Sequence, residues 1–365
     1  FRSDDTLNKT KLCVLFGGVS TEHDISLLSA TAILRELDRA RYDILPVGIT
    51  KSGRWLYLPE WTEECMKNDA WQEQAGAVPV PLSVDRTRPG LFAQESEAFY
   101  PVECVFPVLH GFNGEDGTMQ GLLEIAGVPF VGCDTAASAM SMDKSITKLI
   151  CANAGVAQAD WIVFSAHELA DAARCVERVE ARFAYPVFVK PACTGSSVGV
   201  SKVKQRDDLM AALRDAAQFD AKILVEEFID GREIETAVLG NEDAQVSCCG
   251  EILPAQEFYS FDATYCDAAS KTRIPAELPD EVAEETRRRA LRVYHALGCT
   301  GLSRVDFFVT RAGDIVFNEI NTIPGFTAIS MYPKLFEARG IPFSALLDHL
   351  VEHAYAAHAA RRNYR

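Results

Sequence analysis

Two short apolar runs near residues 304 and 319 carry polar side chains whose types and spacing suit a metal or phosphate site. Arg304 and Asp306 are two residues apart, and Glu319 and Asn321 are also two apart. Side chains two apart in an extended strand point to the same face, so neighbouring strands would bring these oxygen donors together beside Arg304. Such donors suit Mg²⁺, which proteins commonly share with substrate phosphates. The alternative is a salt bridge between Arg304 and a carboxylate on an exposed sheet face.

Two glycine-containing turns are suited to presenting backbone N–H groups to an anion. The sequence after Asn321 is TIPGFT, and its Pro-Gly turn, which ends in Gly325, can aim an N–H at an oxyanion. Lys190 precedes the glycine-rich segment 195–199, GSSVG, and a lysine at a strand end beside such a loop can bind phosphates. The chain lacks the GxxxxGK pattern of a Walker P-loop, and a plain hairpin turn is the alternative.

Two further polar segments follow apolar runs. The segment 17–26, GGVSTEHDIS, permits close backbone approach at its glycines, and Glu22 within it would bind a cationic ammonium group. The alternative is helix capping by its Ser or Thr, with Glu22 in the first turn. The segment 110–118, HGFNGEDGT, is a polar turn of the kind that binds ligands at the strand ends of open α/β sheets. Capping of a helix by Asp116 is the alternative there.

The elements that would position these segments alternate between apolar runs and helical stretches, which favours α/β and α+β architecture. A chain of 365 residues is long enough for two or three domains. Strands at 12–16, 43–49 and 102–109 with a helix at 25–37 predict a doubly wound domain in the first ~135 residues. Residues 60–96 lack periodicity, and we interpret them as a variable insertion.

The rest of the chain predicts a small α+β unit followed by a larger one. Its expected helices are 143–154, one between 164 and 187, 280–297 and one from about 343. Its expected strands are 161–164, 187–190, 224–228 and the two runs near 304 and 319. A long loop is expected at 253–275.

Composition excludes several classes of protein. A net charge of −16 disfavours a nucleic-acid binder, which needs a basic surface. No apolar run approaches the ~20 residues that cross a bilayer, and the N-terminus lacks a signal-peptide core. The eleven cysteines are scattered without CxxC pairs, which indicates reduced thiols in a cytoplasmic protein. The C-terminal histidines lack the HExxH order of a zinc hydrolase.

Seven segments in this order resemble the D-alanine–D-alanine ligase family of the ATP-grasp superfamily, from Lys11 to about Tyr355. They are FGGVSTEHDISLLSA, HGFNGEDGTMQG, SMDKSITK, VKPACTGSSVGVSKV, FYSFDATY, GLSRVDFF and NEINTIPGFTAISMYP. The resemblance implies a three-domain ATP-grasp ligase. It places an N-terminal doubly wound (pre-ATP-grasp) domain that binds the first substrate at 1–136. A central subdomain with a glycine-rich lid follows at 137–228, and a C-terminal subdomain with an omega loop and the Mg²⁺ site at 229–365.

The family resemblance also implies a two-step reaction for peptidoglycan precursor synthesis. The carboxylate of one D-alanine attacks the γ-phosphate of ATP, and the amine of a second D-alanine then displaces phosphate from the acyl phosphate. Two Mg²⁺ ions, which Mn²⁺ can replace, would assist. The implied state is a cytoplasmic homodimer with small-molecule substrates and with no nucleic-acid or membrane partner.

By this resemblance, lysines contact the ATP phosphates, backbone groups of Glu227 and Ile229 read the adenine edge, and Glu233 holds the ribose. The implied nucleotide-binding set is Lys144, Lys190, Ser197, Glu226, Glu227, Phe228, Ile229, Glu233 and Phe307. The implied metal ligands are Asp306, Glu319 and Asn321.

The resemblance also assigns the groups around the two amino acids. Glu22 would take the first ammonium, with Ser196 linking Glu22 to Tyr265. Arg304 and the N–H of Gly325 would stabilise the tetrahedral oxyanion. The substrate-binding set is completed by His110, Ser330 and Met331, with Ser330 binding the second carboxylate.

Two positions bear on the second substrate and one departs from the family pattern. Tyr265 favours an amine acceptor over D-lactate, and the apolar Met331 suits D-alanine, with D-serine next. The family usually has Lys where this chain has Thr264, and losing that contact costs ~1.5–3 kcal/mol, roughly ten- to hundredfold in rate. Lys271 is a candidate substitute. The alternatives are a D-alanine–D-serine or D-lactate ligase, another carboxylate–amine ligase, and a nucleotide-binding homologue without turnover.

Overall fold

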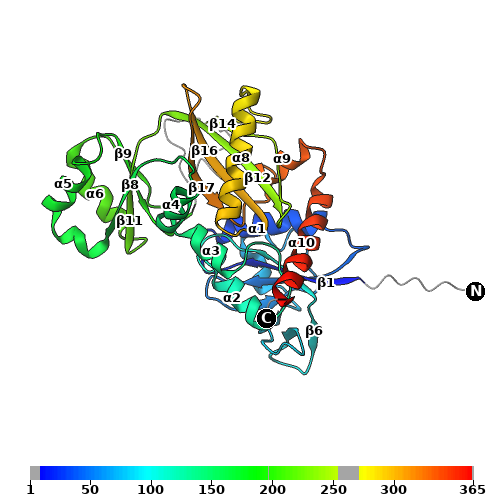
Figure 1. The fold of residues 1–365 in the computed structure, drawn as a ribbon. Helices are drawn as coiled ribbons and strands as arrows, with labels where there is room; N and C mark the ends of the chain where they lie inside the picture. The colour runs from blue at the N-terminus through cyan, green and yellow to red at the C-terminus, as the bar shows by residue number, and fades with distance from the viewer. Residues whose placement is uncertain (1–8, 196, 254–270, 364–365) are drawn as a thin grey trace, which may run out of the picture.

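The computed structural model describes residues 9–195, 197–253 and 271–363. The strands of these residues form three sheets and a two-stranded ribbon of β5 (Gly90–Phe92) and β6 (Phe99–Pro101). In Figure 1 the blue and cyan N-terminal part lies below the yellow and orange C-terminal sheet, and the green central part projects to one side.

The first sheet has the strand order β4-β3-β2-β1-β7, and it is parallel at its centre. β1 pairs in parallel with β2 and β7, and α1 (His23–Glu36) supplies the crossover that a parallel pair requires. The shorter strands β3 and β4 extend the sheet in antiparallel fashion. The strands are β1 (Thr10–Gly17), β2 (Tyr42–Ile49), β3 (Trp55–Tyr57), β4 (Val78–Pro79) and β7 (Cys104–Val108).

β1 is buried on both faces because successive side chains of a strand alternate between them. Leu12 and Val14 pack in one core with α1 and the C-terminal helix α10 (Phe343–Asn363). Cys13 and Leu15 pack in another with α2 (Thr118–Ala126). Helices on both faces of a mainly parallel sheet confirm the predicted doubly wound arrangement.

Residues 60–96, which the sequence led us to interpret as a variable insertion, contribute to the sheet and to the core. It contains β4 and the 3-10 helix η1 (Lys67–Glu73). Trp71 in η1 is fully buried, and its ring centroid lies 5.3 Å from that of Phe16. A Cβ at Gly48 would come within 2.3 Å of the Trp71 ring. One aromatic residue without periodic neighbours leaves no pattern in the sequence, so its burial was not predicted.

Replacing Trp71 with Ala is expected to lower the free energy of unfolding by about 3–5 kcal/mol, the usual range for removing a large aromatic side chain from a core. Trp61→Ala serves as the control, because Trp61 is only partly buried against the same core. Denaturant unfolding of both variants measures the difference. A loss below about 1 kcal/mol for Trp71→Ala would show that the segment is dispensable.

The second sheet is antiparallel, with the order β10-β9-β11-β8. Its strands are β8 (Trp161–Ser165), β9 (Val187–Pro191), β10 (Ser201–Val203) and β11 (Lys222–Glu227). Helices α5 (Ala172–Glu180) and α6 (Arg206–Ala216) and the 3-10 helix η2 (Ala166–Ala170) share a core with it. Helices α3 (Thr135–Met142) and α4 (Lys144–Asn153) precede it in the chain.

The third sheet has the order β15-β14-β12-β16-β17, with β13 (Gln245–Val246) paired to β12. α8 (Asp280–Ala296) packs its apolar side chains on one face, and this leaves the other face available for polar groups. The strands are β12 (Gly231–Gly240), β14 (Gly250–Leu253), β15 (Lys271–Arg273), β16 (Gly301–Thr310) and β17 (Ile315–Asn321). β15 corrects the expectation that 253–275 is a loop throughout.

The C-terminal helices join the third sheet to the first. α9 (Met331–Glu337) and α10 contribute Tyr332, Leu346 and Leu350 to the core that also contains Leu12. Among the described residues, no helix combines the length and apolarity needed to cross a bilayer.

Candidate active site

A cavity of about 640 Å³ lies among the three sheets. Every predicted site residue within the described part of the chain lines it. These residues are Glu22, His110, Lys144, Lys190, Ser197, Glu226, Glu227, Phe228, Ile229, Glu233, Arg304, Asp306, Phe307, Glu319, Asn321, Gly325, Ser330 and Met331. Ser196 and Tyr265 lie outside the described residues, as does Thr264. Lys271 is exposed in β15, whereas its neighbour Thr272 lines the cavity.

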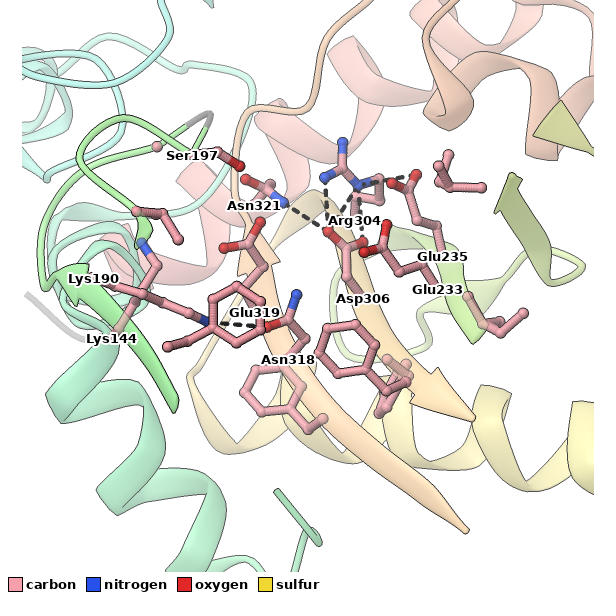
Figure 2. A pocket seen from close by; sticks show the side chains of 18 of the residues that line it. Lys144, Lys190, Ser197, Glu233, Glu235, Arg304, Asp306, Asn318, Glu319 and Asn321 are labelled. Carbon is pink, nitrogen blue, oxygen red and sulfur yellow. Dashed lines mark hydrogen bonds and ion pairs between the residues drawn. The ribbon is translucent and has the colours of Figure 1, made fainter. Parts of the chain in front are cut away.

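The acidic end of the cavity is built from one face of the third sheet. Register pairs Asp306 with Glu319 and Arg304 with Asn321, which confirms that the two apolar runs are neighbouring strands. The next strand, β12, places Glu235 opposite Asp306. Because side chains alternate along a strand, these groups share the face opposite α8, and Figure 2 shows them converging.

The predicted salt bridge and the predicted oxygen cluster are both present. Arg304 Nη2 donates to Asp306 Oδ2 at 2.7 Å, and Arg304 Nε lies 3.2 Å from Glu235 Oε2. Asn321 Nδ2 donates to Asp306 Oδ2 at 3.2 Å. Asp306 is only 7% exposed, so this is a buried cluster and not an ion pair on an open sheet face.

This end of the cavity carries more negative than positive charge. Burial, together with the nearby carboxylates Asp306 and Glu319, raises the pKa of Glu233 to about 7. Burial raises the pKa of Glu235 to about 8, although Arg304 acts in the opposite direction. Buried like charges disfavour ionisation, and a divalent cation would relieve that repulsion. The donor set, carboxylates and an amide oxygen, fits Mg²⁺.

A β-bulge brings an additional residue to this face. The register of β16 and β17 shifts between Asp306 and Phe307, so Phe307 pairs with Phe317 and Asn318 is the extra residue. Asn318 Oδ1 accepts from Lys190 Nζ at 3.4 Å (Figure 2). The bulge therefore connects the lysine of the second sheet to the acidic face of the third.

The basic side of the cavity lies between α4 and the second sheet. Asp143 caps α4 by accepting from the backbone N–H of Ser145 at 2.9 Å, which places Lys144 at the first helical position. Lys144 Nζ donates to the carbonyl of Thr194, at the start of the glycine-rich segment. Lys190 Nζ lies 2.6 Å from Glu226 Oε2. Two lysines from different elements thus face the same space.

The third end of the cavity is formed by the N-terminal domain. α1 begins at His23 with Glu22 as its N-cap residue, and the N–H of Glu22 donates to Ser20 Oγ at 3.1 Å. Glu22 is only 5% exposed, and a Cβ at Gly195 would meet its carboxylate at 3.1 Å. The expectation that Ser20 or Thr21 caps this helix was wrong, because Glu22 itself is the N-cap residue and no side chain among the described residues caps the helix. The glycine-rich segment does approach the Glu22 carboxylate.

His110 and Glu115 fasten the segment 110–118 to the turn after β17. His110 Nδ1 lies 3.0 Å from the carbonyl of Ile323, and burial lowers the pKa of His110 to about 4. Glu115 accepts from the N–H groups of Gly111 at 2.9 Å and Ile323 at 3.1 Å. Asp116 accepts from the N–H of Thr118 at 3.0 Å, but the N-cap residue of α2 is Gly117 and not Asp116 as the capping alternative expected.

Glu115 is expected to make stability depend on pH. Burial, followed by the charge of Glu22, raises its pKa to about 8, so the folded state holds a proton that the unfolded chain releases near pH 4.5. Its contribution to stability is fully present below that pH and is lost as pH rises to about 8, by at most ~1.4 kcal/mol per pH unit. Glu115→Gln should remove this slope. Urea unfolding of both proteins at pH 5 and pH 8, in chelator, measures it, and equal slopes would contradict it.

The turn that holds Gly325 is shaped by Ser330. The N–H of Thr327 donates to Ser330 Oγ at 3.0 Å, and a Cβ at Gly325 would come within 2.8 Å of that hydroxyl oxygen. Met331, the first residue of α9, is buried, and its methyl group fills the space beside Gly250. The second-substrate residues expected from the sequence are thus adjacent to one another.

Several cavity residues were missed by sequence reasoning. Glu115 lies inside a recognised segment, and its place in that segment was the available signal. Glu235 and Asn318 depend on strand register, and Lys148 on the packing of α4, so no local pattern identified them.

The three sheets and a cavity that combines lysines, a glycine-rich segment and clustered carboxylates define an ATP-grasp ligase. Residues 11–133 match the family described as "D-ala D-ala ligase N-terminus", and residues 150–352 match "D-ala D-ala ligase C-terminus". The chain therefore belongs to the D-alanine–D-alanine ligase family.

Similar proteins match over nearly their full lengths. The D-alanine–D-alanine ligase of Caldicellulosiruptor bescii is 48% identical over 349 residues, covering 94% of this chain and 95% of that protein. That of Chlorobium limicola is 48% identical over 357 residues, covering 95% and 98%.

Two solved structures are similar in fold and sequence. The VanG D-Ala:D-Ser ligase from Enterococcus faecalis has a TM-score of 0.87 and 39% identity, covering 95% of this chain and 99% of that one. The D-alanine–D-alanine ligase from Coxiella burnetii has a TM-score of 0.85 and 36% identity, covering 98% and 97%.

Proposed function

We propose that this chain joins two D-alanines to D-alanyl-D-alanine with cleavage of ATP to ADP and phosphate, for peptidoglycan precursor synthesis. The observation that carries the proposal is that Glu22, Arg304 and Lys190, from three different parts of the fold, line the same cavity. The names of the full-length relatives support the same reaction.

The first step forms an acyl phosphate. A carboxylate oxygen of the first D-alanine attacks the γ-phosphorus, and the bond to the β-γ bridging oxygen breaks and releases ADP. Glu22 pairs with the ammonium of this substrate, and Lys144 and Lys190 neutralise phosphate oxygens. Because phosphoryl transfer depends mainly on positioning and charge neutralisation, ammonium groups fixed by packing lower the barrier.

The second step forms the peptide bond. The amine nitrogen of the second D-alanine attacks the acyl carbon, the nitrogen loses a proton, and phosphate leaves from the tetrahedral intermediate. Arg304 and the N–H of Gly325 face the developing oxyanion, and Ser330 binds the second carboxylate. Donors held in place before the reaction stabilise that charge without reorganisation.

Asp306, Glu319 and Asn321 would hold the two Mg²⁺ ions. The bound ions would neutralise phosphate oxygens of ATP, and Mn²⁺ would be able to replace them. Glu233 and Glu235 lie beside this set and have raised pKa values. A bound cation would lower these pKa values by stabilising the ionised carboxylates.

The three-domain division is part of the proposal, with units at 1–136, 137–228 and 229–365. Each unit contains one of the three larger sheets, and the first also contains the ribbon of β5 and β6. The cavity lies among the three units. Closure of the cavity during the reaction would exclude water. A homodimer in the cytoplasm is proposed from the family resemblance alone.

D-Serine is the second candidate acceptor, because the VanG D-Ala:D-Ser ligase is among the similar structures. Met331 argues for D-alanine, since its apolar side chain is buried beside Ser330 and offers no partner for a hydroxyl group. A buried hydroxyl without a hydrogen bond costs free energy.

The test is release of ADP and phosphate with Mg-ATP and D-alanine, with D-serine or D-lactate as competing acceptor and products identified by mass. D-Alanyl-D-alanine as the main product is the expected result. Preference for D-serine or D-lactate would overturn the assignment of Met331 and Tyr265. ATP binding without ADP release in any mixture would overturn the ligase function and make Thr264→Lys the first variant to test.

A further inference from the structure

The carboxylate of Glu226 is held between two buried lysines. Lys190 Nζ lies 2.6 Å from Oε2, and Lys148 Nζ, from α4, lies 3.0 Å from Oε1. The Lys148 side chain is only 2% exposed. Burial alone would raise the pKa of Glu226, but Lys190 and then Lys148 lower it to about 2. Glu226 is therefore a buried carboxylate with two counter-ions.

Lys148 is fixed by its surroundings. Its ammonium donates to the carbonyl of Ala159 at 3.3 Å and lies 5.4 Å from the centre of the Trp161 ring. Lys148 and Ala159 line the same cavity as Glu226 and the aromatic residues Phe188 and Phe317. Lys148 is therefore held at the cavity wall with Glu226 as its charged partner.

Lys190 and Lys148 are expected to have different partners once a nucleotide is bound. Lys190 also reaches Asn318 on the acidic sheet, and the proposed function directs it to the phosphates. The Lys148 side chain is too enclosed to reach the phosphates as well, so it remains the counter-ion of Glu226. The contact between Lys148 and Oε1 lacks hydrogen-bond geometry, and Oε1 is buried with no hydrogen-bond donor among the described residues. Glu226 also lines the cavity, so its carboxylate can accept a hydrogen bond from a ligand that fills the cavity.

We propose that Lys148 is a positioning residue for nucleotide selection, which holds Glu226 as an acceptor against the edge of the base so that a 6-aminopurine is favoured over a 6-oxopurine. This proposal rests on the proposed function and on the family resemblance, which implies that the base lies beside residues 226–229, all of which line the cavity. An ionised carboxylate only accepts hydrogen bonds. The 6-amino group of adenine donates one, whereas the 6-oxo group of hypoxanthine presents a second acceptor and is repelled.

Loss of Lys148 removes one of the two positive charges that keep Glu226 ionised. Without it, Glu226 either keeps Lys190 away from the phosphates or takes up a proton. A protonated carboxyl can donate to a 6-oxo group, so discrimination between the two bases falls. A buried polar group that is hydrogen-bonded by the right ligand discriminates strongly against a ligand that leaves it unpaired.

The experiment compares the affinities of ADP and IDP by calorimetry for the wild type, Lys148→Met, Glu226→Gln and the double variant. These ligands need no turnover, so failure of the ligase assay and failure of this proposal are separate results. We expect the wild type to bind ADP at least about tenfold more tightly than IDP. Lys148→Met should reduce that ratio about tenfold, mostly by weakening ADP. In the ATP reaction the loss should fall on the nucleotide KM more than on kcat.

The double variant separates positioning from direct action. If Lys148 acts through Glu226, Lys148→Met should add less than about threefold to the effect of Glu226→Gln on the ADP-to-IDP ratio. Three results would overturn the proposal. The effects of the two substitutions on the ADP-to-IDP affinity ratio could multiply in the double variant, the ratio could be unchanged in Lys148→Met, or that variant could lose affinity equally for ADP and IDP. Lys148→Gln, which keeps a neutral donor, replaces Lys148→Met if thermal melting shows the latter unfolded. The exposed Lys67→Met is the matched control.

Discussion

Arg304→Met is expected to lower kcat by about 10²–10³-fold, the usual effect of removing a preorganised donor from a developing oxyanion. Arg304 is held by Asp306 at 2.7 Å and lies near Glu235 at 3.2 Å, so its guanidinium is in place before substrate binds. The proposed role is confined to the second step. Rapid-quench measurement of ADP release and of dipeptide should therefore show the larger loss in dipeptide formation.

The free energy of unfolding of Arg304→Met must be measured together with its activity. Removing one partner of a buried ion pair leaves carboxylates without a counter-charge, which costs about 3–5 kcal/mol. Mg²⁺ and ADP should recover part of that loss. Arg311→Met is the matched control, because Arg311 is exposed in the turn that joins the same two strands. A variant that folds, binds ADP and forms dipeptide at the wild-type rate would remove Arg304 from the mechanism.

Glu319→Gln is expected to raise the Mg²⁺ concentration needed for half-maximal activity by at least about tenfold, within the range that changes around a metal produce. Glu319 lies opposite Asp306 on the acidic face, and the variant removes one of the charges that attract the cation. Activity at limiting Mg²⁺ should fall about a hundredfold, and part of it should return at high Mg²⁺. Chelator should abolish activity of the wild type, with recovery on adding Mg²⁺ or Mn²⁺.

A direct binding measurement keeps this result independent of turnover. Mn²⁺ titration in the presence of ADP, followed by electron paramagnetic resonance, should show weaker binding in Glu319→Gln. Glu242→Gln is the control, since Glu242 is exposed in the connection between β12 and β13. Unchanged Mn²⁺ affinity would exclude Glu319 as a ligand and transfer the role to Glu233 or Glu235.

The strands of the acidic face could be predicted because their signal, the alternation of side chains, lies within a few consecutive residues. Val305 separates Arg304 from Asp306, and Ile320 separates Glu319 from Asn321. Such alternation reports the two faces of a strand directly. Elements marked by long apolar periodicity, such as α1, α8 and α10, were likewise recognised within a few residues of their observed ends.

Other features had no local signal. Glu235 reaches the acidic face only because β12 pairs with β16 in one register, and Asn318 only because a bulge interrupts that face. A shift of one residue would send each side chain to the opposite face. Register is decided by packing across the whole sheet, which a single segment does not encode.

The sequence by itself determined the α/β and α+β class, the ligase family and the residue types that its chemistry needs, because motifs and periodicity are properties of neighbours along the chain. The tertiary structure decided how those segments meet. It buried Trp71 beneath Phe16, placed Lys148 against Glu226 and raised the pKa of Glu115 by enclosing it near Glu22. Burial and charge–charge interaction depend on distances between residues remote in sequence, so they are fixed only when the chain is folded.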